Sequence, residues 1–133
     1  MTSETIKMHP IGVVRTDIAD IPRHWSVSRA EGILEIDHQY RKGLKDIRSG
    51  QKIVVLFCFD RSEVFHSDLL VQHPKHKDRE TGVFSLCSPR RPNPIGLSVV
   101  EVIAVVETGL GVRGIDMMDG TPILDIKPHV TGG

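Results

Sequence analysis

The chain has 133 residues and a mass of 14.8 kDa, and its 17 Lys and Arg residues balance 17 Asp and Glu residues. This length predicts a single domain over residues 1–133, because domains usually contain roughly 100–150 residues. The proportions of apolar and charged residues are ordinary for a soluble globular protein. A net charge of zero excludes a protein that binds nucleic acid by bulk electrostatics, and it excludes a polybasic membrane anchor.

The two cysteines, Cys58 and Cys87, form no Cys-x-x-Cys pair and give no sign of a disulfide framework. The longest strongly apolar run, residues 53–59, falls far short of the ~20 residues that a membrane span needs. Residues 1–5 contain no basic segment leading into an apolar one, as a signal peptide would. We therefore expect a reduced, cytoplasmic protein with no membrane association.

Short segments rich in branched apolar residues and bounded by Gly or Pro predict a mainly β fold, a small barrel-like domain with one short helix. The segment over residues 51–59 contains a continuous apolar run, residues 53–59, which predicts a strand covered on both faces. In chain order, the predicted strands are residues 9–16, 31–37, 51–59, 82–87, 96–107, 110–116 and 123–127.

The helix is predicted at about residues 40–47, where Tyr40, Leu44 and Ile47 recur at helical spacing on one face. Two further segments, residues 16–30 and 61–81, read as long loops. Loops of this length within a compact domain are more often functional than neutral, so both are places to look for a site.

Residues 88–98 are the most unusual stretch, because three of the eight prolines occur within six residues there. Proline fixes φ and removes an N–H, so the segment predicts a rigid loop whose carbonyls lack nearby N–H partners. Such carbonyls can accept hydrogen bonds from a ligand, such as an adenine amino group, or face a sulfonium cation. Gly96 permits close backbone approach. A stiff connection between strands explains the prolines equally well.

A second element framed by prolines starts at the Asp119–Gly120 turn signal and runs to Pro128. Alternation along the following strand predicts that Asp125 and Lys127 point to the same side. Such a pair can orient a substrate or move a proton. The alternative, a surface ion pair on an edge strand, stays open.

The long loop over residues 61–81 carries His66, His73 and His76, whose spacing matches no named zinc pattern. A metal-dependent enzyme is one interpretation of this cluster, and a loop that faces phosphate through Lys75 and Lys77 is another. The segment from Pro22 to Trp25 places the only tryptophan beside an arginine, where it could stack on a base or plug a loop.

Five strings occur in order along the chain: IGVVRT at 11–16, IPR at 21–23, GVF at 82–84, RPNPIGLS at 91–98 and DGTPILDIKP at 119–128. Together they resemble the TsaA-like family, also called TrmO, over nearly the whole chain. The resemblance implies a small β-barrel methyltransferase, not of the Rossmann type, that uses S-adenosylmethionine (SAM) and is usually dimeric. It implies tRNA as substrate, with N6 of threonylcarbamoyladenosine beside the anticodon as the methyl acceptor.

Carried over by position, the resemblance implies contacts to SAM from several separate segments, and no metal. These contacts are Pro22, Arg23, His24, Asp60, Arg61, Cys87, Leu97, Asp119, Gly120, Thr121 and Pro122. We add Asn93 from the proline-rich stretch over residues 88–98, which we call the RPNP loop. We expect Asp125 and Lys127 to orient the acceptor, with Asp125 as a proton acceptor, although the N6 proton is acidic enough that no base need act. The residues expected to bind the substrate RNA are Lys75, Lys77, Arg90 and Arg91.

The chain departs from the family pattern at several of these positions. The family usually has an arginine where this chain has Cys87, with Arg90 close by as a substitute. It has glutamine in place of His24 and histidine in place of Asp60, and its longer bacterial members have a C-terminal extension that is not present here. A dimeric SAM-binding or nucleotide-binding module without catalysis, and a methyltransferase with another acceptor, are therefore alternatives.

The zero net charge also hides a division along the chain. Residues 72–97 carry five cations against two anions, a local +3, whereas residues 98–133 carry two against five, a local −3. The excess positive charge falls in the long loop and the RPNP loop, where it could dock a tRNA arm. A neutral total therefore does not exclude an RNA substrate.

Overall fold

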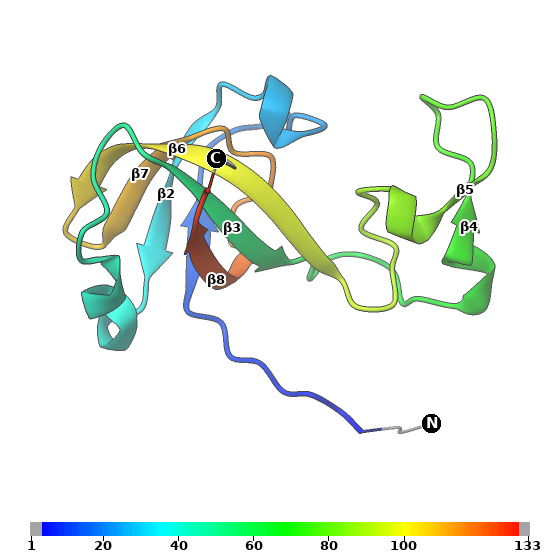
Figure 1. The fold of residues 1–133 in the computed structure, drawn as a ribbon, viewed down its shortest axis with the longest axis horizontal. Coiled ribbons are helices and arrows are strands. Elements are labelled where there is room, and N and C mark those ends of the chain that lie inside the picture. Colours follow the sequence, from blue (N-terminus) through cyan, green and yellow to red (C-terminus); the bar gives the residue numbers. More distant parts are fainter. Residues whose placement is uncertain (1–3, 131–133) are drawn as a thin grey trace.

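A closed antiparallel barrel forms the body of the molecule in the computed structural model, which describes residues 4–130 (Figure 1). Its strands follow the order β1-β2-β7-β6-β3-β8, and β8 pairs with β1 to close it. The strands are β1 (Gly12–Arg15), β2 (Glu31–Ile36), β3 (Lys52–Cys58), β6 (Ile95–Val106), β7 (Gly109–Arg113) and β8 (Pro122–Pro128). The mainly β prediction is confirmed, and each of these strands lies within or close to a predicted segment.

Alternating residues of the strands point into the barrel and form one apolar core. On β3, Ile53, Val55 and Phe57 are buried, whereas Val54 and Leu56 between them are only half-buried. The prediction that this strand is covered on both faces is therefore wrong. A barrel filled by its own side chains leaves the outer face of each strand to solvent and loops.

Close approach between strands requires glycine at one barrel crossing. A Cβ added to Gly109 on β7 would run into the carbonyl oxygen of Leu34 on the neighbouring strand β2. Because glycine has no Cβ, the backbones of β2 and β7 can approach closely at this point, where Leu34 and Leu110 are both fully buried.

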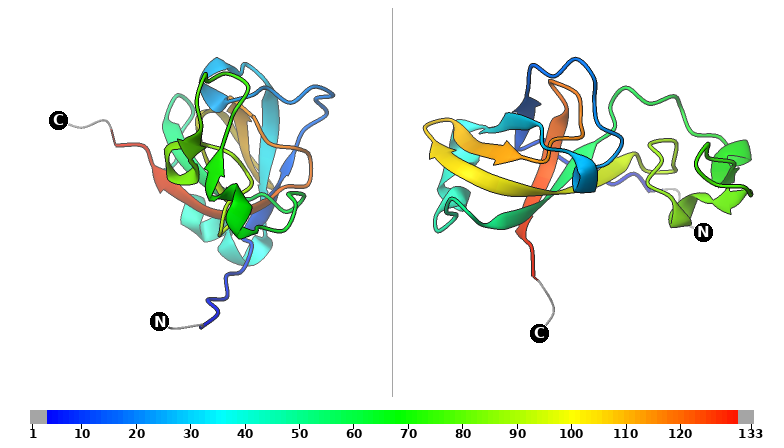
Figure 2. Two further views of the ribbon diagram at one scale, coloured as in Figure 1. Left: turned by 90° about the vertical axis from the view of Figure 1, so that its right-hand side faces the viewer. Right: turned by 90° about the horizontal axis from the view of Figure 1, so that it is seen from above.

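Residues 59–94, which we call the excursion, leave the barrel after β3 and return to it at β6 (Figures 1 and 2). Two-residue strands β4 (Val71–Gln72) and β5 (Thr81–Gly82) pair with each other, between the 3-10 helices η3 (Ser67–Leu70) and η4 (Val83–Ser85). The predicted strand over residues 82–87 is thus largely wrong. After Gly82 the backbone turns into η4, because its partner strand β4 begins at Val71, opposite Gly82, and the residue before it belongs to η3.

The predicted helix is present as the 3-10 helix η2 (His38–Leu44), which starts two residues earlier than expected. Asp46, with φ of 75°, turns the chain out of the helix before Ile47. Leu44 and Ile47 still pack against the barrel core, as their spacing predicts. A further short helix, η1 (Trp25–Val27), lies in the loop 16–30. No helix within residues 4–130 is long and apolar enough to cross a membrane.

Candidate functional site

Two neighbouring cavities lie where the excursion joins the barrel. The smaller, about 220 Å³, is lined by the end of β3, the start of the excursion and residues 116–121. The larger, about 590 Å³, lies between the excursion and the loop 16–30. Pro89 lines both cavities, so the two spaces adjoin at the RPNP loop. Segments far apart in the sequence therefore meet at one place.

The smaller cavity combines an apolar wall with a few polar groups. The Phe57 and Phe59 rings meet edge to face, with centroids 5.0 Å apart, and Met117 and Met118 line the cavity with them. Its polar lining includes Asp60, Arg61, Asp116 and Thr121. An apolar pocket with few oriented polar groups is the usual form of a small-molecule site.

The predicted turn at Asp119–Gly120 is present and is fixed by hydrogen bonds from both sides. The Arg61 guanidinium donates to the carbonyl oxygen of Asp119, and the Asp119 carboxylate accepts the Thr16 N–H at 3.0 Å. Gly120 has φ of 84°, a conformation that favours glycine, and Thr121 donates its hydroxyl to the carbonyl of Met118 at 2.6 Å. Arg61 thus joins the excursion to the turn that the family resemblance predicted.

Asp116 is a carboxylate that the sequence analysis did not single out. Burial raises the pKa of Asp116, and hydrogen bonds from Ser98 and from the Trp25 main chain, together with the charge of His24, oppose that shift. Ser98 is fully buried on β6. A carboxylate kept beside a cavity despite the cost of desolvation is a candidate functional group.

The larger cavity gathers five of the predicted residues: Arg23, His24, Lys77, Cys87 and Arg90. The His24 ring is held by its Nδ1 atom, which accepts the Ser26 N–H at 3.2 Å and lies 2.7 Å from the Ser26 hydroxyl. Arg90 pairs with Glu63 at 3.4 Å, and the Cys87 thiol is free. Cations therefore surround this cavity, from the loop 16–30 and from the excursion.

The RPNP loop does not have the free carbonyls that its prolines predicted. The Pro89 carbonyl accepts from the Ser62 hydroxyl at 3.2 Å, and that of Pro94 accepts the Phe59 N–H at 2.8 Å. The Arg90 carbonyl accepts a hydrogen bond from the Gln72 side-chain amide. The Arg91 guanidinium donates to the carbonyls of Leu86 and Ser88. That prediction is wrong at these positions, because side chains of the excursion and the Phe59 backbone N–H supply the donors that the prolines remove.

Several predicted contact residues line neither cavity. Leu97 points outward from β6 and is exposed, and Asn93 is exposed on the RPNP loop. Pro122 pairs with Val13 across β8 and β1. Pro22 and Lys75 belong to the neighbouring loops but not to the lining, so the roles of these residues stay predictions.

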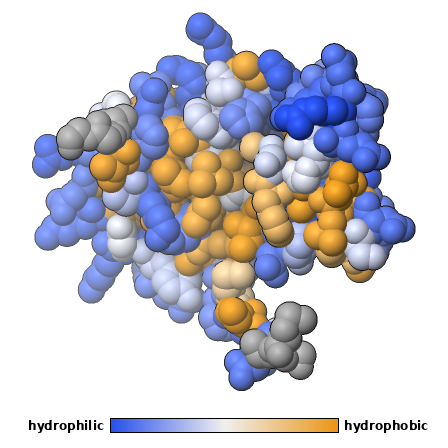
Figure 3. Space-filling view, turned by 45° about the vertical axis from the view of Figure 1, so that its right-hand side comes forward, coloured by the Kyte–Doolittle hydropathy of each residue, from blue (hydrophilic) through white to orange (hydrophobic). Residues whose placement is uncertain are grey.

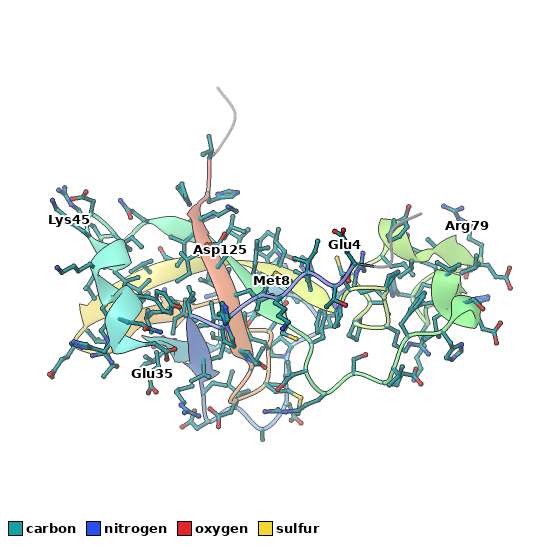
Figure 4. All side chains as sticks on the ribbon, turned by 90° about the horizontal axis from the view of Figure 1, so that it is seen from below. Glu4, Met8, Glu35, Lys45, Arg79 and Asp125 are labelled. Atoms are coloured by element: carbon teal, nitrogen blue, oxygen red, sulfur yellow. The ribbon has the colours of Figure 1, made fainter. Side chains whose placement is uncertain are left out.

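Asp125 and Lys127 do form the predicted pair, with Nζ to Oδ2 at 3.0 Å. They line a third cavity of about 710 Å³, between β8 and η2, where Leu44 and Ile47 also lie. Figure 4 shows Asp125 on the barrel and Arg79 at the outer end of the excursion. The structure does not bring this pair together with the predicted cofactor residues, so its catalytic role stays a prediction.

The histidines of the excursion do not form a metal site. His66 lies 3.8 Å from Asp68 on the exposed surface, while His76 lines the larger cavity. Within residues 4–130, no three His, Cys, Asp or Glu side chains gather as metal coordination requires.

The functional candidates that sequence reasoning missed are Asp116 and the Phe57 and Phe59 rings. Asp116 is the last residue of the predicted strand 110–116, and Phe59 is the last residue of the predicted strand 51–59, so the sequence pattern assigns each to a strand and not to a site. A carboxylate at the end of a run that is otherwise buried is the signal that could have identified Asp116.

Comparison with known proteins identifies the family of this chain. The family model for the tRNA-methyltransferase O N-terminal domain matches residues 13–132. This chain belongs to that family. The TrmO of Pseudomonas aeruginosa, known from a crystal structure, superposes with a TM-score of 0.74 at 31% identity, over 96% of this chain and 57% of that one.

Two curated relatives show the range of proteins in which this domain occurs. A probable S-adenosyl-L-methionine-binding protein of Archaeoglobus fulgidus is 38% identical over 127 residues, which cover 93% of this chain and 34% of that protein. A tRNA (adenine(37)-N6)-methyltransferase of Mus musculus is 42% identical over 76 residues, 57% of this chain and 18% of that protein. This chain thus spans only about a third of the first relative's length.

Proposed function

We propose that this protein binds SAM at the two adjoining cavities and transfers its methyl group to N6 of threonylcarbamoyladenosine beside the anticodon of tRNA. The observation that carries the proposal is the convergence of residues from four separate segments. Arg23 and His24, Asp60 and Arg61, Cys87, and Asp119 to Thr121 all meet where the excursion joins the barrel. The names of the curated relatives, one for binding SAM and one for methylating tRNA, support both parts.

The residues present fit SAM chemically. The larger cavity lies within the roughly 300–1,000 Å³ range of small-molecule sites, and Arg23 and Arg90 offer guanidinium groups suited to the carboxylate of the cofactor. The smaller cavity offers apolar and carboxylate surface but few hydrogen-bond donors, which suits a positive sulfur centre. When bound, SAM supplies an activated methyl group.

The chemical step needs alignment more than covalent help from the protein. The bond from N6 to the methyl carbon forms as the bond from sulfur to that carbon breaks, the sulfonium becomes a neutral thioether, and N6 loses its proton. Holding the two reactants in line supplies most of the acceleration. We assign the orienting role to Asp125 and Lys127, with the Asp125 carboxylate as the group able to take the proton.

A second copy of the chain is part of the proposal. In a single chain the Asp125–Lys127 pair faces a different cavity from the cofactor residues. The excursion exposes large apolar side chains, with Val64 88% and Phe84 78% exposed, and Figure 3 shows apolar surface gathered at the centre of one face of the molecule. Surface of this kind favours a partner, so we expect a homodimer in which one copy completes the site of the other.

Substrate RNA would approach over the excursion. Lys75, Lys77 and Arg79 lie on its surface, and Arg90 lines the larger cavity beside Lys77. Arg91 is the exception, since its guanidinium already holds the RPNP loop. Cations grouped in this way suit the phosphates of a tRNA arm, and tRNA as substrate places the enzyme in the cytoplasm.

One observation favours a second candidate, a SAM-binding module without catalysis. The cavity wall carries Cys87 where the family has an arginine, so one expected cation is missing. Arg90 lines the same cavity and can supply that charge, so we rank catalysis first.

Transfer of radiolabelled methyl groups from SAM to tRNA, with and without the threonylcarbamoyl group, tests the proposal. We expect labelling of the modified tRNA only, about tenfold slower or more in Asp125→Asn if that carboxylate takes the proton. Binding of SAM without transfer to either tRNA would identify the module instead. Faster transfer by Cys87→Arg would show that the missing arginine limits this chain.

A further inference from the structure

Asp116 occupies a position that the proposed function has not used. It is absent from the residues that the family resemblance implies, yet its carboxylate lines the smaller cavity with Asp60, Arg61 and Thr121. Groups on two other elements face it. The Ser98 hydroxyl donates from β6, and the Trp25 main-chain N–H and the charge of His24 act from the loop 16–30. These contacts hold the carboxylate at the cavity wall.

The rest of the cavity wall is suited to a cation that cannot donate a strong hydrogen bond. Phe57 and Phe59 supply aromatic rings, and Met117 and Met118 supply polarisable thioethers. An ammonium group would need several acceptors, whereas a sulfonium needs only negative charge and polarisable surface. Two carboxylates, Asp60 and Asp116, line the cavity with these rings and thioethers, and the Arg61 guanidinium there already donates to the Asp119 carbonyl. This combination favours a sulfonium centre.

We propose that Asp116 faces the sulfonium of SAM and makes the site prefer the charged cofactor over its neutral thioether product, S-adenosylhomocysteine. The inference rests on the proposed function, because it assumes that these cavities bind SAM. Its consequence is release of product. Once the methyl group has left, the sulfur atom of the product carries no charge, so the carboxylate of Asp116 no longer attracts it.

Keeping an ionised Asp116 at the cavity wall for ligand binding lowers the free energy of unfolding of the protein. Burial disfavours the ionised carboxylate, so a neutral amide would avoid that cost. If Asp116 served only to accept the hydrogen bonds from Ser98 and the Trp25 main chain, its amide variant would be less stable than the parent and would bind SAM equally well. A residue kept for ligand binding gives a different result. Its amide variant is as stable as the parent or more so, and it binds the cationic ligand more weakly.

Calorimetric titration of SAM and of S-adenosylhomocysteine into the full chain and into Asp116→Asn tests the proposal. We expect the variant to bind SAM about tenfold more weakly and to bind S-adenosylhomocysteine with less than about a threefold change. Asp20→Asn, which makes the same charge change at an exposed position of the loop 16–30, is the matched control and should change neither affinity. Equal weakening for both ligands, or no weakening, overturns the role of Asp116.

Failure of the parent chain to bind either ligand would instead overturn the proposed function. If Asp116→Asn does not fold, titrations of the parent chain at decreasing pH replace it. Protonation of Asp116 should weaken the binding of SAM more than the binding of S-adenosylhomocysteine. Because the charge of His24 opposes the raised pKa of Asp116, the same selective loss should begin at higher pH in His24→Gln. An unchanged ratio of the two affinities over that range would contradict the proposal.

Discussion

The barrel and the excursion are built on different principles. In the barrel, side chains such as Leu34, Val55 and Leu110 are fully buried in one apolar core, and every strand has two neighbours. In the excursion, Leu69 and Val83 are the buried apolar residues among those described, and the buried Gln72 amide donates to the carbonyls of Leu69 and Arg90. The barrel is therefore stabilised mainly by apolar burial, and the excursion by hydrogen bonds from side chains to the backbone.

This contrast explains where the candidate site lies. A rigid barrel gives fixed positions to Phe57, Ser98 and the Asp119 turn, and the loosely supported excursion brings Arg61 and Cys87 to them. Loops on a rigid scaffold are the usual place for binding residues. The excursion also leaves large apolar side chains such as Val64 and Phe84 exposed, whereas the core of the barrel is fully buried.

Leu34→Ala should produce the largest effect. The residue is 0% exposed in the barrel core, so its truncation should lower the free energy of unfolding by about 3 kcal/mol or more. Leu70→Ala makes the same chemical change in the excursion, where the side chain is 44% exposed, and should cost less than about 1 kcal/mol. Urea unfolding measures both, and equal losses would contradict the contrast between the two regions.

Gly96→Ala tests the junction between the two regions. A Cβ at this position of β6 would run into the Phe57 ring, which lines the smaller cavity. We expect a loss of about 1–3 kcal/mol in thermal unfolding, together with weaker SAM binding, because the ring must shift. Gly43→Ala, where an added Cβ meets nothing within 4 Å, serves as the control. A fully stable Gly96→Ala would show that the ring is not held as described.

Gln72→Leu should loosen the excursion and leave the barrel intact. Two buried carbonyls would lose their donor, at a cost of about 1–2 kcal/mol. Amide hydrogen exchange should therefore speed up within residues 59–94 and stay unchanged in β2 and β7. Gln39→Leu, at an exposed position of η2, controls for the change in polarity. Faster exchange throughout the barrel would mean that the two regions unfold as one.

The smallest effect concerns pH. Because burial raises the pKa of Asp116, the folded state holds this proton more tightly than the unfolded state, and the associated stability is lost as pH rises through the raised value. Asp116→Asn should therefore gain stability relative to the parent on going from acidic to neutral pH. Urea unfolding at a series of pH values measures the difference, and a constant difference between the two proteins would contradict a raised pKa.

The sequence predicted the barrel better than the excursion, for a physical reason. Short segments rich in branched apolar residues and bounded by Gly or Pro predict strands, and that signal depends only on local sequence. Most of the excursion, residues 61–81, reads as a loop instead. Its order depends on long-range hydrogen bonds, such as those from Gln72 to the Arg90 carbonyl and from Ser62 to the Pro89 carbonyl, which no spacing reveals.

The candidate site shows the same limit. Arg61 and Cys87 were predicted by position from the family resemblance, and the Asp119 turn lies within one of the motif strings. The structure brings all three to the adjoining cavities. The pairing of Asp125 with Lys127 followed from strand alternation, but their distance from those cavities depends on how the barrel closes. Asp116 was overlooked because its partners, Ser98 and the Trp25 main chain, are far away in the sequence.

Calorimetric titration of SAM into two variants tests the central claim most directly, because they alter different cavities. Arg61→Ala removes the contact between the excursion and the Asp119 turn, whereas Lys45→Ala changes an exposed cation on the cavity shared by η2 and β8. We expect the parent chain and Lys45→Ala to bind SAM alike, and Arg61→Ala to bind about tenfold more weakly or worse. No binding by the parent chain, or a loss confined to Lys45→Ala, would contradict a cofactor site at the junction of excursion and barrel.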